Sequence, residues 1–343
     1  MDKNKEKQSQ EVLQKIQTEL QRQIPISLEI KELKVYFLID KKEVKAVDGV
    51  NLCLYKGKTL GLVGESGCGK SLTALSILRL TPPQSQIVGG KILFEGEDLL
   101  KYSNSQLRQI RGGKISMIFQ DASSSLNPVF TIGNQIYEAI RLHQNLSPKE
   151  AKEKVKSLLK LVGIPSPEEQ FFRYPHQLSG GMNQRVMIAM AVASNPAILI
   201  ADEPTTALDV TIQAQVLVLL KELQAKLNMS ILLITHDLSI IAQITDYVAI
   251  MYAGKIVEEA TTNEIFSNPL HPYTKALLAS IPKLDSETKR LPYIPGTVPN
   301  GFFTSLTGCR FHPRCKEVTS ICTQEEPVMK KIDNTHQLSC WKI

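Results

Sequence analysis

The segment GESGCGKS at residues 64–71 limits the possible folds of this chain more than any other feature. Its spacing, Gly-x-x-x-x-Gly-Lys-Ser, is typical of a loop whose glycines let backbone N–H groups converge on phosphate oxygens, while the lysine and the serine hydroxyl reach the terminal phosphate and Mg²⁺. An apolar run at 59–63 leads into the loop, and a helical pattern follows at 71–80 until Pro82 ends it. The sequence therefore predicts a strand, a nucleotide-binding loop and a helix in an α/β fold.

Two further stretches predict elements on either side of this unit. Residues 28–54 alternate apolar and polar side chains, with turn signals at 40–41 and 48–49, and this pattern predicts antiparallel strands. Residues 127–195 are helical in pattern and contain the start signal SPKE at 147–150. They indicate a helical insertion between two halves of a sheet.

Two short apolar runs, 197–201 and 230–235, fit buried parallel strands that end in residues suited to catalysis. Asp202 and Glu203 follow the first run; Asp202 suits holding Mg²⁺, and Glu203 suits activating an attacking water as general base. His236 follows the second run and suits a hydrogen bond to the terminal phosphate, although a lone histidine at a strand end is more often structural. Because a phosphate loop lies in the same chain, we favour the catalytic interpretation.

Length and composition add a second, smaller unit. A chain of 343 residues exceeds what a single core usually supports, so one large domain plus an appendage is expected. Beyond Pro269 prolines accumulate, and four of the six cysteines lie in the last 35 residues, so we place a domain boundary near Asn268. The formal charge of +6 is spread without a block of like charges, so we expect no nucleic-acid partner.

The sequence lacks the marks of a membrane-spanning or secreted chain. No run of 18 apolar residues is present, and the first 23 residues lack the continuous apolar core of a signal peptide. We therefore expect a cytoplasmic location. Within an N-terminal extension over 1–27, the side chains of Val12, Leu13, Ile16 and Leu20 lie at helical spacing and predict an amphipathic helix. The alternative is a partly ordered extension.

The order of these segments resembles the ATPase subunit of ABC transporters over residues 28–268. Four further segments match. Gln120 is similar to the Q-loop, and LSGGM at 178–182 is similar to the signature. ALD at 207–209 is similar to the D-loop, and His236 is similar to the switch histidine. The resemblance implies an α/β, ABC-type P-loop NTPase with a RecA-like core, an antiparallel β-subdomain and a helical subdomain at about 127–195. Asn183 departs from the related sequences, which commonly have a basic residue there, and this affects the subunit interface rather than nucleotide binding.

The resemblance also implies roles for individual residues. It implies catalysis by Glu203, His236, Gln120 and Lys70, and Mg²⁺ ligation by Ser71, Gln120 and Asp202. The ATP-binding residues that it implies are Phe37, Gly64, Glu65, Ser66, Gly67, Cys68, Gly69, Lys70, Ser71, Leu72, Gln120, Asp202, Ser179, Gly180, Gly181 and Asp209. Residues 179–181 precede a helical run, so they form an anion site, which we expect to face the nucleotide of a second ABC ATPase subunit. Phe37 is the expected adenine-stacking residue; the alternative is a core aromatic on a strand.

The cysteines near the end of the chain suggest what the smaller unit holds. Cys309, Cys315, Cys322 and Cys340 are separated by five, six and seventeen residues, which matches zinc sites poorly, and a cytosolic setting argues against structural disulfides. Four thiolates in a small proline-rich segment suit a [4Fe–4S] cluster. Zinc and free or reversibly bonded thiols are the alternatives. Cys53 and Cys68 are better explained as packing or spacer residues.

The same tail indicates a cargo. GCRFHPRC at 308–315 and PGTVP at 295–299 closely resemble the C-terminal extension, here 269–343, of dipeptide and oligopeptide importer ATPases, and the resemblance implies a [4Fe–4S] cluster on the four cysteines. We therefore expect an ATPase, peripheral to the cytoplasmic side of the cell membrane, that powers import of di- or oligopeptides. Its expected partners are two transmembrane permease subunits, an extracytoplasmic peptide-binding lipoprotein and a second, related ABC ATPase subunit in a heterodimer. The alternatives are a nickel importer, a soluble ABC-type ATPase acting in translation or on DNA, and a partner subunit that binds ATP without hydrolysing it.

Overall fold

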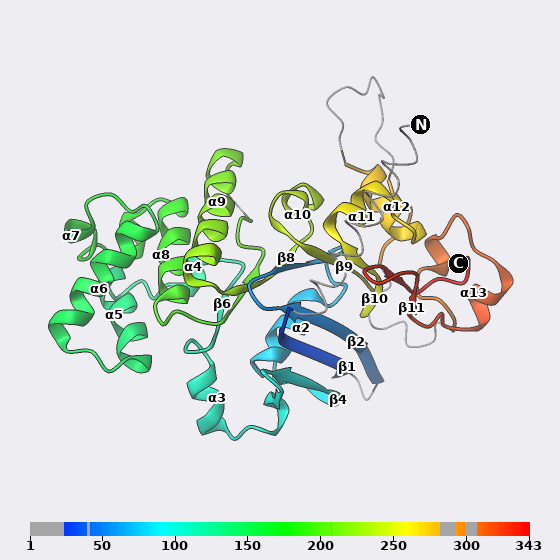
Figure 1. Cartoon of the computed structure of the whole chain (residues 1–343), viewed down its shortest axis with the longest axis horizontal. Helices are drawn as coiled ribbons and strands as arrows, with labels where there is room; N and C mark the ends of the chain where they lie inside the picture. Colours follow the sequence, from blue (N-terminus) through cyan, green and yellow to red (C-terminus); the bar gives the residue numbers. More distant parts are fainter. Residues whose placement is uncertain (1–23, 40–41, 207, 282–292, 299–306) are drawn as a thin grey trace, which may run out of the picture.

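The computed structural model of the chain describes residues 24–39, 42–206, 208–281, 293–298 and 307–343 (Figure 1). The helix expected around Val12 and Leu20 lies outside these residues, as does Ala207 of the D-loop-like segment. Among the helices described, none is both long and apolar enough to cross a membrane.

A large mixed sheet carries the phosphate loop. Its strand order is β11-β12-β10-β9-β3-β8-β7-β6, and the strands from β9 to β6 run parallel. The strands are β3 (Thr59–Val63), β6 (Ile115–Ile118), β7 (Ile198–Asp202), β8 (Ser230–Thr235), β9 (Tyr247–Tyr252), β10 (Lys255–Thr261), β11 (Lys330–Lys331) and β12 (Gln337–Leu338). Because β3, β8 and β7 are parallel neighbours, the residues after them meet at one edge of the sheet.

A second sheet is antiparallel and has the order β2-β1-β4-β5. Its strands are β1 (Ile26–Ile39), β2 (Lys42–Tyr55), β4 (Ser85–Phe94) and β5 (Glu97–Asp98). The pairing of β1 with β2 across 40–41 confirms the expected antiparallel strands. The turn expected at 48–49 is wrong, because Asp48 and Gly49 lie within β2, where Gly49 has a φ of 78° and the register shifts. A glycine with positive φ here forms a bulge rather than a chain reversal.

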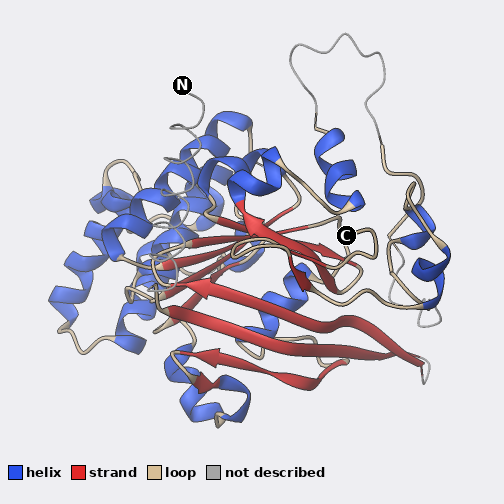
Figure 2. Ribbon diagram, turned by 45° about the vertical axis from the view of Figure 1, so that its right-hand side comes forward, coloured by secondary structure: helices blue, strands red, loops and turns tan. Residues whose placement is uncertain are grey.

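Most of the helices either gather at one end of the molecule or lie along the large sheet (Figures 1 and 2). They are α2 (Lys70–Ile77), α3 (Asn104–Ile110), α4 (Ala122–Ser125), α5 (Ile132–His143), α6 (Pro148–Leu161), α7 (Pro167–Gln170), α8 (Gly180–Val192), α9 (Val210–Leu227), α10 (Leu238–Ile244), α11 (Thr262–Ser267), α12 (Pro272–Ala279) and α13 (Ser320–Gln324), with short 3₁₀ turns η1 (Leu99–Lys101), η2 (Pro175–Gln177) and η3 (His312–Arg314). The start signal at 147–150 is confirmed, because Ser147 and Glu150 form a capping box on α6.

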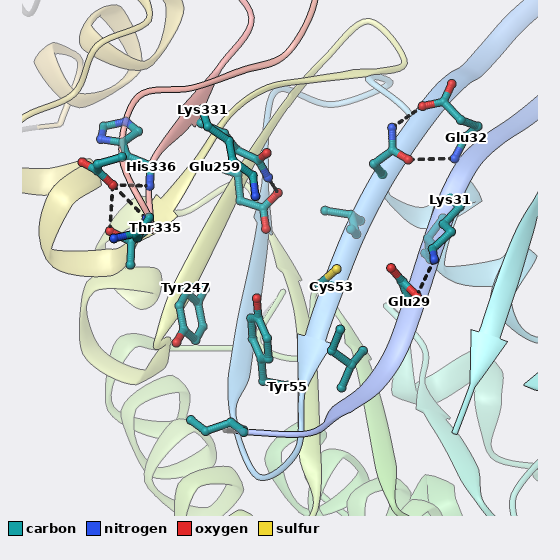
Figure 3. Close-up of a pocket in the computed structure, with 18 residues that line it drawn as sticks. Glu29, Lys31, Glu32, Cys53, Tyr55, Tyr247, Glu259, Lys331, Thr335 and His336 are labelled. Carbon is teal, nitrogen blue, oxygen red and sulfur yellow. Dashed lines mark hydrogen bonds and ion pairs between the residues drawn. The ribbon is translucent and has the colours of Figure 1, made fainter. Parts of the chain in front are cut away.

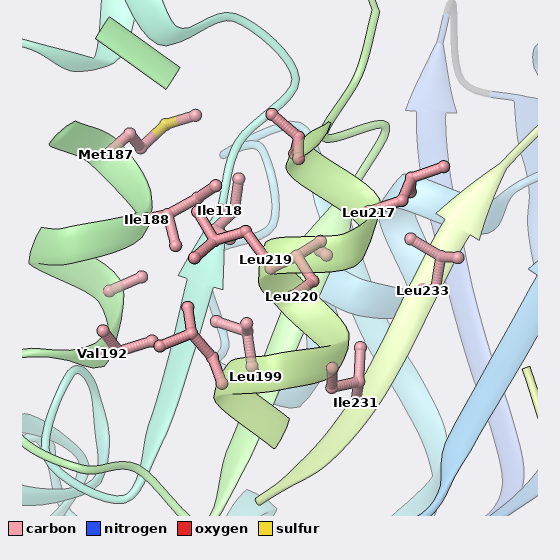
Figure 4. Packing of buried hydrophobic residues seen from close by; sticks show 14 of the residues in the cluster. Ile118, Met187, Ile188, Val192, Leu199, Leu217, Leu219, Leu220, Ile231 and Leu233 are labelled. Atoms are coloured by element: carbon pink, nitrogen blue, oxygen red, sulfur yellow. The ribbon is translucent and has the colours of Figure 1, made fainter. Parts of the chain in front are cut away.

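Apolar side chains join α8 and α9 to the parallel strands (Figure 4). Ile188 of α8 and Leu220 of α9 are fully buried, as are Leu199 of β7 and Leu233 of β8. Removing such a side chain typically costs about 2 to 5 kcal/mol, because the lost burial is compounded by a cavity. This packing fixes the strand ends that carry the polar residues of the site.

The last strands attach the C-terminal region to the large sheet. β12 pairs with β10, and beneath this pairing the buried Glu258 carboxylate accepts a hydrogen bond from His336 Nε2 at 2.7 Å. Burial would raise the pKa of Glu258, but the hydrogen bonds from His336 and from the backbone N–H groups of Leu270 and His271 contribute to leaving that pKa below its ordinary value. Burial would lower the pKa of His336, but the hydrogen bond and charge of Glu258 outweigh it and raise that pKa.

The domain boundary near Asn268 stays a prediction.

The attachment of β12 should weaken as the pH rises through the raised pKa of His336. The stabilisation from protonated His336 is complete below the ordinary histidine pKa of about 6.5 and is lost above the folded-state value. The measurement is amide hydrogen exchange of β12 against pH. His336→Gln, which cannot titrate, should remove most of that pH dependence, and an unchanged slope in this variant would contradict the assignment.

Candidate active site

The phosphate loop leaves β3 and enters α2 at Gly69, which has a φ of 109° and is the N-cap of the helix. A Cβ at Gly64 would lie 2.1 Å from the carbonyl oxygen of Met251, so only glycine fits against β9. Lys70 is 5% exposed, and its Nζ donates to the carbonyl oxygens of Gly64 at 2.7 Å and Glu65 at 3.0 Å. The loop thus holds its lysine against its own backbone, beside the space where phosphates bind.

Ser71 and Asp202 come together from α2 and β7. Ser71 Oγ donates to Asp202 Oδ1 at 3.0 Å, and Asp202 is 5% exposed. Burial raises the pKa of Asp202, although the hydrogen bond from Ser71 opposes this. A hydroxyl and a carboxylate are the oxygen donors that Mg²⁺ accepts beside nucleotide phosphates, so the residues present fit that ion.

Glu203 is fixed by three side chains. Its carboxylate accepts hydrogen bonds from His236 Nδ1 at 3.0 Å, Thr206 Oγ1 at 2.9 Å and Gln120 Nε2 at 3.0 Å. Burial would raise the pKa of Glu203, but the hydrogen bonds from His236 and Thr206 outweigh it and leave the pKa below its ordinary value. Glu203 is therefore ionised near neutral pH, as a general base must be.

A cavity of about 510 Å³ connects the loop with this carboxylate. It is lined by Val63, Gly64, Glu65, Ser66, Gln120, Glu203, Thr206, His236 and Leu277. The structure thus brings the predicted residues after β3, β6, β7 and β8 to one site. The sequence interpretation missed Thr206; the available signal was its position in the turn after β7, where its N–H donates to the Glu203 carbonyl oxygen at 3.2 Å.

The signature-like and D-loop-like residues lie elsewhere. Ser179 is the N-cap of α8, and Asp209 is the N-cap of α9, where it accepts from Ile212 N at 2.9 Å. Ser179 and Gly180 are exposed, and Gly181 is half-buried. None of these four residues lines the cavity beside the phosphate loop. Their roles in nucleotide binding stay predictions.

The remaining predicted ATP-binding residues are split between the loop and the antiparallel sheet. Cys68 is buried, which raises the pKa of its thiol, and this fits a packing role inside the loop. Gly67 is an exposed glycine of the loop, and Leu72 is half-buried in the first turn of α2. Phe37 lies half-buried on β1, in register with Val44 and Ser85, and does not line the cavity. Its adenine-stacking role stays a prediction.

A second pocket, of about 710 Å³, lies away from the loop, between β1, β2 and the C-terminal strands (Figure 3). The rings of Tyr55 and Tyr247 lie 5.2 Å apart along it, and the Glu259 carboxylate accepts from Gln337 at 2.7 Å. Burial raises the pKa of Glu259 to about 7. Although this pocket is larger, it contains none of the phosphate-loop or carboxylate residues, so the smaller cavity is the candidate active site.

The expected [4Fe–4S] cluster is wrong. Cys309, Cys315, Cys322 and Cys340 lie around one small pocket as free cysteines, but within the described ranges no group of three or more His, Cys, Asp or Glu side chains is placed to hold a metal ion. Burial raises the pKa of Cys309 to about 11 and also raises the pKa of Cys315. This burial favours the neutral thiol over the thiolate in both cysteines.

Comparisons with known proteins agree with the geometry of the site. Residues 47–206 match the family model of ABC transporters, and residues 257–322 match that of the oligopeptide/dipeptide transporter C-terminal region. The chain is 50% identical over 315 residues to the dipeptide transport ATP-binding protein DppD of Bacillus subtilis, covering 92% of this chain and 94% of that protein. It is 50% identical over 318 residues to the oligopeptide transport ATP-binding protein OppD of the same organism, covering 92% and 88%. Neither name mentions an iron–sulfur cluster.

Solved structures show the same fold. The ATP-binding cassette MJ0796, a dimer in a post-hydrolysis state bound to ADP and phosphate, superposes with a TM-score of 0.62 at 26% identity, covering 68% of this chain and 98% of that one. The cbiO1 protein of Clostridium perfringens, part of the ABC transporter complex cbiONQ, superposes with a TM-score of 0.61 at 27% identity, covering 71% and 91%.

Proposed function

The chain belongs to the ATP-binding subunits of ABC transporters that import di- and oligopeptides, and we propose which of its residues carry out the hydrolysis that powers this import. The observation that carries the proposal is that three side chains hydrogen-bond to the Glu203 carboxylate, in the cavity that is also lined by the phosphate loop. A carboxylate that is ionised, oriented and beside a phosphate-binding loop is suited to accept a proton from water.

Each polar group then has one task in hydrolysis. Lys70 and the backbone N–H groups of the loop bind the phosphates, and Glu203 orients the attacking water and takes up its proton. His236 and Thr206 keep the Glu203 carboxylate ionised and correctly turned. Ser71 and Asp202 would hold Mg²⁺, and the ion would supply positive charge that neutralises the phosphates. Gln120 follows β6 and helps to orient the Glu203 carboxylate through its side-chain amide.

The residues outside the cavity are proposed to act on a second ABC ATPase subunit. Ser179 and Gly180 lie exposed at the N-terminal end of α8, where backbone N–H groups and the helix dipole favour an anion. An exposed anion site away from the chain's own loop suits ATP held by a partner. A related chain in a heterodimer is the partner that we favour.

A cluster of exposed apolar side chains is proposed to face the permease. Val129 and Phe130 precede α5, Phe172 and Tyr174 follow α7, and all four are exposed. The two segments are joined by backbone hydrogen bonds, including Ile132 N to Arg173 O at 2.9 Å. Exposed apolar clusters of this kind mark protein contacts. Docking here would hold the chain at the cytoplasmic side of the membrane, with a peptide-binding lipoprotein supplying cargo from the opposite side.

The function predicts coupled hydrolysis and peptide uptake. Proteoliposomes that contain this chain, its permease and its partner ATPase should take up a labelled dipeptide only when ATP is hydrolysed. Lys70→Ala should lose both uptake and phosphate release, because the buried lysine is the fixed cation of the phosphate loop. Uptake is read as trapped label and hydrolysis as released phosphate. Uptake of nickel but not of peptide would contradict the proposed cargo.

A further inference from the structure

The carboxylate of Glu65, within the phosphate loop, is paired with an arginine 249 residues along the chain. Arg314 donates from its two terminal nitrogens to the two carboxylate oxygens of Glu65, at 2.7 and 2.9 Å. Its Nε donates to the carbonyl oxygen of Pro295 at 2.8 Å, and the residue is only 8% exposed. A two-pronged pair of this kind fixes both distance and orientation, so the contact is specific.

A second group of the C-terminal region holds the same loop residue through its backbone. The N–H of Glu65 donates to the hydroxyl of Tyr273 at 3.0 Å, and Tyr273 is fully buried on α12. Its ring packs against Tyr252 and Phe311, with ring centroids 4.7 and 5.2 Å apart. Phe311 is three residues before Arg314, so one packed aromatic cluster supports both contacts to the loop.

We propose that Arg314 is a positioning residue for ATP, which holds the phosphate loop through Glu65 and neutralises that carboxylate beside the bound phosphates. The proposal rests on the assignment of ATP to this loop. Glu65 lines the candidate cavity, so without Arg314 its charge would repel a ligand in proportion to the charge of the phosphate chain. The C-terminal region thereby contributes to the ATP site. Because coupling between two sites is reciprocal, bound ATP in turn stabilises the contact of the C-terminal region with the phosphate loop.

The test compares two nucleotides that share a base but differ in phosphate charge. Fluorescent trinitrophenyl derivatives of ATP and AMP are titrated into the full chain. Arg314→Ala should lower the affinity for the ATP derivative about tenfold and the affinity for the AMP derivative much less, because like-charge repulsion grows with ligand charge. Arg314→Ala with Glu65→Gln should recover most of the affinity for the ATP derivative, because the unpaired carboxylate is gone. The matched control is Lys342→Ala, which breaks the exposed ion pair with Glu317 in the same region.

A role limited to folding gives a different pattern. Equal losses of affinity for the two nucleotides in Arg314→Ala would overturn the proposal. So would a double variant that recovers no affinity for the ATP derivative. If Arg314→Ala does not fold, Arg314→Lys decides, because it keeps the charge and loses the two-pronged contact; it should give an intermediate affinity for the ATP derivative, and wild-type affinity would count against positioning. Failure of the wild-type chain to bind the ATP derivative would instead refute the proposed function.

Discussion

Glu203→Gln should lower ATP turnover about a thousandfold while ATP still binds. The amide has nearly the same size and can keep hydrogen bonds to its neighbours, but it cannot accept the proton of the attacking water, and general-base catalysis contributes roughly 10² to 10⁴ in rate. Thr206 and His236 keep Glu203 ionised through hydrogen bonds to its carboxylate, at 2.9 and 3.0 Å respectively. The measurement is steady-state phosphate release alongside nucleotide titration.

A matched carboxylate tests whether this loss is specific to the site. Glu264 is the N3 residue of the capping box on α11 and does not line the candidate cavity, so Glu264→Gln should keep wild-type turnover. The trapped ATP should also stabilise association with the second ABC ATPase subunit, which size-exclusion chromatography detects. Turnover in Glu203→Gln equal to wild type would show that this chain binds ATP without using Glu203 as its base.

The parts of the fold that the sequence predicted best rest on local signals. The strand expected at 230–235 is β8 with the same bounds, because an apolar run of this length is typical of a strand and too short for an ordinary helix. The helix start at 147–150 follows from the capping box alone. The catalytic group was predictable because its residues follow parallel strands, and parallel strands end at one edge.

The parts that the sequence did not predict depend on contacts between distant segments. No local pattern joins Glu65 to Arg314, or adds β12 to the edge of β10. Gly49 reads as a turn residue, yet the pairing of β1 and β2 absorbs it as a bulge. The four cysteines gave the [4Fe–4S] error because their spacing in the sequence does not determine whether the fold places them to hold a metal ion, and among the described residues no such group of side chains is found.

Gly64→Ala should lower ATP turnover about a hundredfold and also weaken ATP binding. An added Cβ would lie 2.1 Å from the backbone carbonyl oxygen of Met251 and 2.8 Å from Cys68 Sγ. The backbone of β9 is buried in the sheet and cannot retreat, so the loop must move, and a displacement near 1 Å in a positioning element costs about 10² in rate. Nucleotide titration measures the affinity for ATP, and phosphate release measures turnover. Thermal unfolding measures how much the added methyl group destabilises the fold.

The same substitution at a tolerant glycine separates loop displacement from a general glycine effect. Gly89 lies on β4 of the antiparallel sheet, has no positive φ, and a Cβ there would meet only the Lys34 side chain at 3.6 Å, an ordinary contact. Gly89→Ala should therefore keep ATP affinity and turnover. Since the two variants add the same methyl group to strand-linked backbone, the difference between them measures the close approach of the phosphate loop to β9. Equal affinities in both variants would mean that the loop adapts, and that Gly64 is not needed for the phosphate site.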